Sequence, residues 1–122
     1  MKRIAVLAAV LAMAARSRRL ALAALTAAGR LDEATVQAAA ADLDEQVRRL
    51  TIAALGSAAP PKISAATAES LVMGGLRDAS GMVRVEALRF YGRTRMAADP
   101  APVIAAVADP YPHVALIAVD LL

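Results

Sequence analysis

The chain has 122 residues, of which 59% are hydrophobic and 2% aromatic; it contains no cysteine and carries a formal net charge of +3 at pH 7. The lack of cysteine excludes disulfides, thiol catalysis and thiolate metal sites. The positive charge is modest and is not gathered into the dense lysine and arginine run of a nucleic-acid-binding tail. Alanine contributes 33 residues, so the composition predicts helices that pack closely through small and aliphatic side chains.

The first element is an apolar stretch, residues 4–13, and it allows two interpretations. Residues 1–14 resemble a secretory signal peptide, with a cleavage site near Ala12, which would mean export. Alternatively, the stretch is the first helix of a repeat, because Val6 lies 30 residues before Val36 and the alanines that follow each of them also match. We favour the repeat, and with it a cytoplasmic location. The stretch is too short to span a membrane.

A repeat in the sequence sets the organisation of the rest. Residues 18–25 (RRLALAAL) return 30 residues later as residues 48–55 (RRLTIAAL), with six of eight positions identical. A repeat of this period is typical of stacked helical units rather than of a single globule. We therefore divide the chain into four units, at about residues 1–30, 31–62, 63–99 and 100–122.

Each later unit is predicted to be a helix, a tight turn and a second helix. Asp32 can cap the first of these helices, and Gly56 can end the second. Turns are expected at Asp42, Asp78 and Asp109, and prolines near residues 102 and 112 suit the first positions of helices. The predicted helices cover residues 31–41, 45–55, 64–76, 81–95, 102–108 and 112–122.

The turn aspartates belong to a longer pattern. In the second, third and fourth units an aspartate precedes a valine by five residues, and in the second and third an arginine follows that valine. The pattern Asp-x4-Val-Arg-x2-Ala/Thr-x3-Leu/Tyr-Gly resembles a HEAT repeat, most closely the short bacterial, phycobilisome-lyase-type variety. The resemblance implies an all-α fold, a right-handed α–α superhelix (solenoid) of about four helical hairpins that forms one domain over residues 1–122.

The resemblance also implies a ladder of ion pairs between adjacent units. In HEAT-like folds the turn aspartate and the arginine of the second helix typically form this ladder, because an aspartate can cap a helix and still accept a charge-assisted hydrogen bond. In the first unit Ala12 stands where the aspartate would be. In the fourth, Ala115 stands where the arginine would be, so either the ladder ends at that unit or the unit is degenerate. The predicted ladder residues are Asp42, Arg48, Asp78, Arg84 and Asp109.

The second helices also predict a candidate partner surface. In each, the repeat valine position and the residues four, seven and eight positions further on form the buried stripe. The positions between them should face outward and combine arginine with apolar side chains, which suits protein recognition better than nucleic acid. The alternative is that neighbouring chain covers part of this face. The candidate surface consists of Arg19, Leu20, Arg49, Leu50, Val85, Arg89, Leu116 and Ile117.

No residue pattern predicts catalysis, a cofactor or a metal site. His113 is the only histidine, and no serine stands in a nucleophile-elbow context. We therefore expect a non-catalytic HEAT-repeat scaffold or adaptor that binds another protein. Two alternatives stay open: a bilin (tetrapyrrole) lyase-like protein or the repeat region of a larger bacterial enzyme, and a HEAT-like DNA-binding module.

The end of the sequence adds one more expectation. Residues 119–122 lie in an apolar helix with no capping residue after it. Because a solenoid needs polar capping units at its ends, we expect either further repeats in a longer array or another protein chain at this end.

Overall fold

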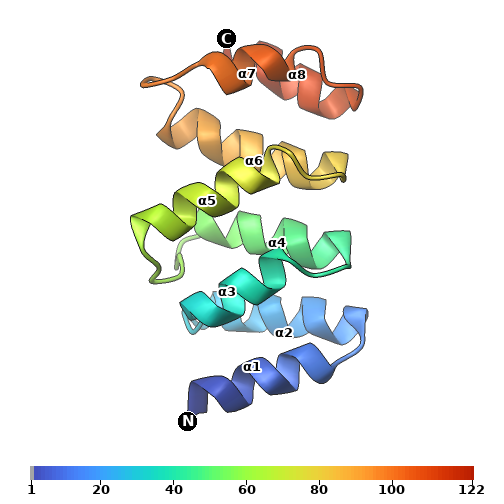
Figure 1. The fold of residues 1–122 in the computed structure, drawn as a ribbon, viewed down its shortest axis with the longest axis vertical. Coiled ribbons are helices and arrows are strands. Elements are labelled where there is room, and N and C mark those ends of the chain that lie inside the picture. The colour runs from blue at the N-terminus through green and yellow to red at the C-terminus, as the bar shows by residue number, and fades with distance from the viewer. Residues whose placement is uncertain (1) are drawn as a thin grey trace.

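The computed structural model describes residues 2–122, with side chains from Val6 onward, and over these residues the chain forms eight α-helices and no strand (Figure 1). The prediction of an all-α fold is confirmed. Met1 and the side chains of residues 2–5, which entered the signal-peptide interpretation, lie outside the described part. The helices are α1 (Lys2–Ala12), α2 (Ala15–Ala27), α3 (Glu33–Ala40), α4 (Glu45–Leu55), α5 (Ala65–Gly75), α6 (Gly81–Thr94), α7 (Ala101–Ala106) and α8 (Pro112–Leu121).

The helices are arranged as four hairpins that follow one another along the long axis of the molecule. The pairs α1–α2, α3–α4, α5–α6 and α7–α8 each pack together, and the second helices α2, α4, α6 and α8 contact one another in that order. The two termini lie at opposite ends (Figure 1). Each hairpin therefore meets its neighbours in the sequence mainly through its second helix.

Local sequence explains where several helices begin. The Asp32 side chain accepts a hydrogen bond from the Thr35 N–H at 2.8 Å and caps α3, as predicted. Asp44 caps α4 through the Val47 N–H at 3.2 Å. These side chains satisfy amide groups that have no partner within the first turn of a helix.

The predicted bounds are close to those observed, and for α4 they are the same. Gly56 is the C-cap of α4 as expected, but its φ of −101° is not left-handed. A Cβ atom here would meet the guanidinium of Arg93 on α6, which is the end of a flexible side chain and can move away. Helix α7 is shorter than the predicted 102–108, because residues 107 and 108 already form the turn toward α8.

The core consists of two clusters along the stack. The cluster in the first two hairpins contains six buried residues, Leu22, Leu31, Val36, Ala39, Val47 and Ala54. The other cluster extends from α4 to α8, is larger and includes Ile52, Val72, Val85, Leu88, Tyr91, Val103 and Val114. Ile63 and Leu71 pack against both clusters and join them.

Candidate functional site

The same arginine–aspartate pair stands at each of the three joins between successive hairpins. Each arginine uses Nε and Nη2 to bind both oxygens of an aspartate in the next hairpin, at distances between 2.7 and 3.0 Å. The guanidinium groups and carboxylates are largely buried, so water screens these ion pairs less than it would at the surface. We call these pairs the rungs: Arg18–Asp42, Arg48–Asp78 and Arg84–Asp109.

Each rung also fixes the two turns that it connects. The Nη1 of Arg48 donates to the carbonyl of Asp42 at 2.9 Å, in the turn that precedes its own helix. Asp78, at the other end of this rung, accepts the Ser80 N–H at 2.8 Å. The same two contacts recur around Arg84 and Asp109. A rung therefore locks the geometry of two turns as well as joining two hairpins.

One detail of the predicted ladder is wrong. The rung aspartates were expected to cap the second helices, but each lies two residues before the N-cap position. Asp44, not Asp42, caps α4, while Asp42 accepts the Asp44 N–H at 2.8 Å. Because that hydrogen bond closes the turn, the carboxylate keeps both oxygens directed at the arginine of the preceding hairpin.

The rungs shift the acidity of their aspartates. The hydrogen bond from Arg18 lowers the pKa of Asp42 below its usual range, and the hydrogen bond from Arg84 does the same for the pKa of Asp109. Burial raises the pKa of Asp78, but hydrogen bonds from Arg48 and the Ser80 N–H outweigh it, and the net shift is downward. The rungs are therefore ion pairs at neutral pH.

The first rung contains a residue that the sequence analysis missed. Arg18 was not among the predicted ladder residues, although it lies 30 positions before Arg48 within the repeated segment. Its Nε binds Asp42 Oδ2 at 2.7 Å. The identity between residues 18–25 and 48–55 places Arg18 at the position of Arg48, which marks it as a rung residue even though the first unit has Ala12 in place of the turn aspartate.

The candidate partner surface lies largely in contacts between neighbouring second helices. Arg19 of α2 pairs with Asp44 of the next hairpin at 2.9 Å, and Arg49 of α4 approaches Glu86 of α6 at 3.6 Å. Leu50 is half-buried and packs against the first core cluster. We call this line of contacts between successive second helices the seam.

Val85 corrects the predicted surface most clearly. It was expected to face outward, but it is 4% exposed and belongs to the larger core cluster, against which Ile117 of α8 also packs. In the repeat alignment Val85 matches Arg49 and Ile117 matches Glu86, so this pair occupies the seam between α6 and α8. The Val85 side chain thus faces away from its own hairpin and is covered by the next hairpin.

Three residues of the predicted surface stay exposed. Leu20 is 66% exposed and Leu116 is 61% exposed, while Arg89 is exposed beside Glu86. Leu20 and Leu116 occupy seam positions on α2 and α8, the first and last of the second helices. The structure therefore does not bring the predicted residues together as one continuous exposed ribbon.

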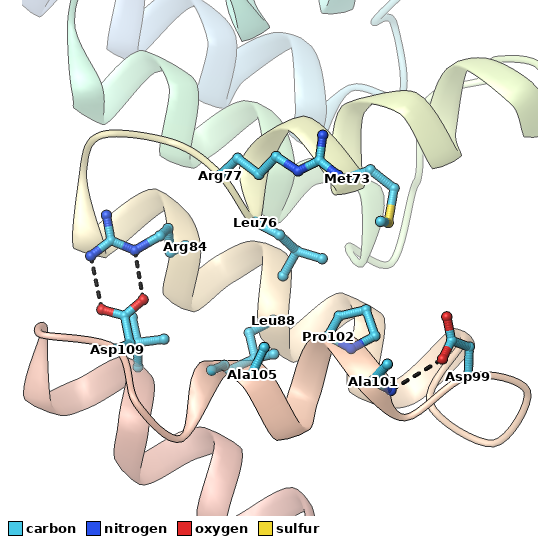
Figure 2. Close-up of a pocket in the computed structure, with 12 residues that line it drawn as sticks. Met73, Leu76, Arg77, Arg84, Leu88, Asp99, Ala101, Pro102, Ala105 and Asp109 are labelled. Carbon is cyan, nitrogen blue, oxygen red and sulfur yellow. Dashed lines mark hydrogen bonds and ion pairs between the residues drawn. The ribbon is translucent and has the colours of Figure 1, made fainter.

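A cavity of about 460 Å³ opens between the third and fourth hairpins (Figure 2). Met73 and Leu76 line it on one side, Pro102 and Ala105 of α7 line it on the other, and the buried Leu88 forms part of its wall. The Arg84–Asp109 rung stands at one end, and Arg77 and Asp99 lie among the lining residues. Helices α5 and α7 are separated by α6 in the chain, so the cavity depends on how the two hairpins pack. No sequence motif marks it.

Comparisons with protein-family models, with curated proteins and with solved structures found no match to this chain. The HEAT resemblance consequently rests on the residues themselves. Among the side chains that the structure describes, no three histidine, aspartate or glutamate residues are grouped so that they could hold a metal ion. Within residues 2–122, none of the helices combines the length and the apolar character that a membrane span needs.

Proposed function

We propose that the chain is a HEAT-like α-solenoid, a right-handed superhelical stack, that serves as a scaffold and binds another protein. The observation that supports this most is the recurrence of the same bidentate rung at three joins, with the second helices side by side. In solenoid proteins, stacking of like units through nearest-neighbour contacts builds extended surfaces that bind partners.

The cavity between α5 and α7 is the best candidate for the contact with that partner. Its walls combine apolar side chains, Met73, Leu76 and Pro102, with charged groups at Arg77 and Asp99. An apolar pocket with polar groups around it is typical of the places where a partner inserts an anchoring side chain. We propose that a partner protein places an apolar side chain here.

The DNA-binding alternative has weaker support. The second helices carry eight arginines, and five of them are already engaged: Arg18, Arg48 and Arg84 in the rungs, and Arg19 and Arg49 in the seam. Phosphate binding would have to compete with these ion pairs.

A cross-linking experiment tests the scaffold function. Because the chain has no cysteine, Ala105→Cys introduces a single thiol beside the cavity, which can carry a photoreactive benzophenone. After illumination in an extract of its native cells, we expect one protein to be cross-linked at Ala105→Cys and not at Ala27→Cys, an exposed position on α2.

The purified partner then provides the decisive measurement. By titration calorimetry, Ala105→Glu should abolish binding, whereas Ala108→Glu, an exposed position outside the cavity lining, should leave it unchanged. Equal cross-linking at both cysteine positions, or equal binding by both glutamate variants, would contradict the proposal. A salt-dependent DNA gel shift, or a change in the absorbance of added bilin, would instead support one of the alternatives.

A further inference from the structure

The third hairpin contains a second, smaller cavity, which lies between its own two helices. Its volume is about 190 Å³. Residues of α5 between positions 65 and 73 line one side, and residues 90–95 at the end of α6 line the other. Because all of these residues belong to one hairpin, the cavity does not depend on how neighbouring hairpins stack. We call it the α5–α6 cavity.

The extra length of these two helices supplies part of the wall. In the repeat alignment, α3 begins at the position that matches Glu69, whereas α5 already begins at Ala65. Helix α4 ends at the position that matches Tyr91, whereas α6 continues to Thr94. The two helices of the hairpin run antiparallel, so both extensions lie at the same end of it (Figure 1). Ala65, Ala68 and Thr94 in these extensions line the cavity.

The apolar part of the lining suits an aromatic ring. The chain has three aromatic residues, and two of them, Phe90 and Tyr91, line this cavity together with the buried Val72 and with Met73. Aromatic rings and a methionine sulfur both make favourable contacts with another aromatic ring. An apolar cavity of about 150 Å³ can hold a benzene molecule. The α5–α6 cavity therefore has the size and the lining for a side chain with one aromatic ring.

The polar groups around this ring space are few. The Tyr91 hydroxyl donates to the carbonyl of Asp99 at 2.6 Å, and the Thr94 hydroxyl donates to a carbonyl of its own helix at 2.8 Å. Both hydroxyl protons are thus engaged within the chain. The remaining polar side chains of the lining are Glu69 and Arg95, which form an ion pair.

This ion pair is built differently from the rungs. A single contact joins it, from Nη2 of Arg95 to Oε2 of Glu69 at 2.7 Å. Among the described residues, no hydrogen bond uses Nε or Nη1 of Arg95 or Oε1 of Glu69. The two side chains are 46% and 50% exposed, so they stand on the solvent side of the cavity. Each can therefore give a ligand a charge-assisted hydrogen bond while the pair itself stays joined.

The two opposite charges specify the polar end of the ligand. A carboxylate alone would bind Arg95 but would lie close to the carboxylate of Glu69, and an ammonium group alone would lie close to the guanidinium. A ligand that carries both charges satisfies both side chains. In an α-amino acid the ammonium group, the carboxylate and the side chain all branch from one carbon atom. The charged groups can then reach the ion pair while the side chain enters the cavity.

We propose that the α5–α6 cavity binds a free α-amino acid with an aromatic side chain. The ring lies against Phe90 and Met73, the carboxylate accepts hydrogen bonds from the unused nitrogen atoms of Arg95, and the ammonium group donates to Oε1 of Glu69. Met73 also lines the cavity between α5 and α7. The amino-acid site is nevertheless independent of the scaffold function, because it needs only the third hairpin.

Titration calorimetry with free phenylalanine tests the site on the purified protein. We expect saturable binding with one site per chain. Phenethylamine lacks the carboxylate and 3-phenylpropionate lacks the ammonium group, so each should bind about tenfold more weakly, as expected for the loss of a hydrogen bond to a charged group. Leucine should also bind more weakly than phenylalanine. Absence of binding up to the solubility limit of phenylalanine, or equal affinity for any of these three analogues, would overturn the proposal.

Substitutions of the ion pair test the two charged contacts. Arg95→Gln and Glu69→Gln should each weaken the binding of phenylalanine about tenfold. Arg89→Gln is the matched control, because Arg89 is an exposed arginine of the same helix outside the cavity lining, and it should bind phenylalanine as the unchanged protein does. Full affinity in either variant of the pair would contradict the proposal.

A matched pair of alanine substitutions on α5 tests the location of the ring. Ala68→Leu fills the cavity and should abolish binding, whereas Ala66→Leu, at an exposed position outside the lining, should leave it unchanged. Circular dichroism and thermal unfolding check that both variants keep their helices. If the two folded variants bound phenylalanine equally well, the ring would not lie in the α5–α6 cavity and the proposal would be wrong.

Discussion

The earlier and later joins of the stack share their rungs but differ in their seams. Between α2 and α4 the seam contains the Arg19–Asp44 ion pair, and between α4 and α6 it contains Arg49 with Glu86. Between α6 and α8 it contains the buried Val85 and, packed against the same cluster, Ile117. The rung thus keeps its geometry whether the seam beside it is charged or apolar. We therefore expect the stability of the later hairpins to depend mainly on apolar packing, and the stability of the earlier hairpins to depend more on ion pairs.

The largest effect is expected from the buried leucine position of the second helices. Leu88→Ala removes a fully buried side chain from the larger cluster and should lower the free energy of unfolding by about 2–5 kcal/mol, measured by urea denaturation. Leu22→Ala makes the same change in the smaller cluster and should chiefly loosen the α1–α2 hairpin. If both substitutions lowered the free energy of unfolding of the whole chain equally, the two regions would not differ as proposed.

Breaking a rung should have the next largest effect. Asp78→Asn leaves Arg48 without its carboxylate and should lower the free energy of unfolding by about 1–3 kcal/mol, less than for a fully buried pair because some solvent reaches it. Asp120→Asn, at an exposed position on α8, should change stability little. If the two variants were equally stable, the rung would not contribute to the join.

The rungs also predict how stability depends on pH. Their aspartates have lower pKa values in the folded chain than the usual value of about 3.9. The rung contribution is therefore fully present above that value and is lost as the pH falls through the lower folded pKa values. Urea denaturation between about pH 2 and 6, which includes the usual aspartate value of about 3.9 and the region below it, should show a smaller acid loss for Asp78→Asn than for the unchanged chain.

Gly56 and Gly92, at equivalent positions in the repeat, test how closely neighbouring hairpins pack. A Cβ on Gly92 would lie 2.6 Å from Cδ2 of Leu121, which packs against the larger cluster, so Gly92→Ala should cost about 1–3 kcal/mol. Gly56→Ala meets the end of the flexible Arg93 side chain, which can move away. Thermal unfolding should therefore show a clear loss for Gly92→Ala and little change for Gly56→Ala.

The smallest effect is expected from the charged seam. Glu86→Gln weakens its contact with Arg49 and should cost about 0.2–1 kcal/mol at low salt. The loss should fade in concentrated salt, which screens exposed pairs. The loss caused by Val85→Ala, at the apolar seam, should persist at every salt concentration. A Glu86→Gln effect that did not respond to salt would mean that the seam there is not electrostatic.

Much of this fold could be predicted because the chain repeats itself. The identity between residues 18–25 and 48–55 sets the period, and the aspartate, valine and arginine spacing marks the turns and second helices. Helix α4 has its predicted bounds because Asp44 and Gly56 flank a run with a single apolar face. The rung partners that were predicted lie together because each arginine is directed at the next turn.

The exposed surface could not be predicted in the same way. Whether a side chain such as Val85 is covered depends on the neighbouring hairpin, and one helix considered alone carries no information about that neighbour. The same residue position is half-buried at Arg49, buried at Val85 and exposed at Leu116. The cavity beside α7 likewise depends on how two hairpins sit together, which a helical pattern does not encode.

Native-state hydrogen exchange tests most directly the claim that neighbouring hairpins hold each other, with the earlier joins relying more on charge. The exchange of each helix is measured by mass spectrometry at low and high salt. We predict the strongest protection in α6 and the weakest in α1 and α2. Raising the salt should cause a further loss of protection that is larger in α1 and α2 than in α7 and α8. A single common protection for all eight helices, unchanged by salt, would contradict the account.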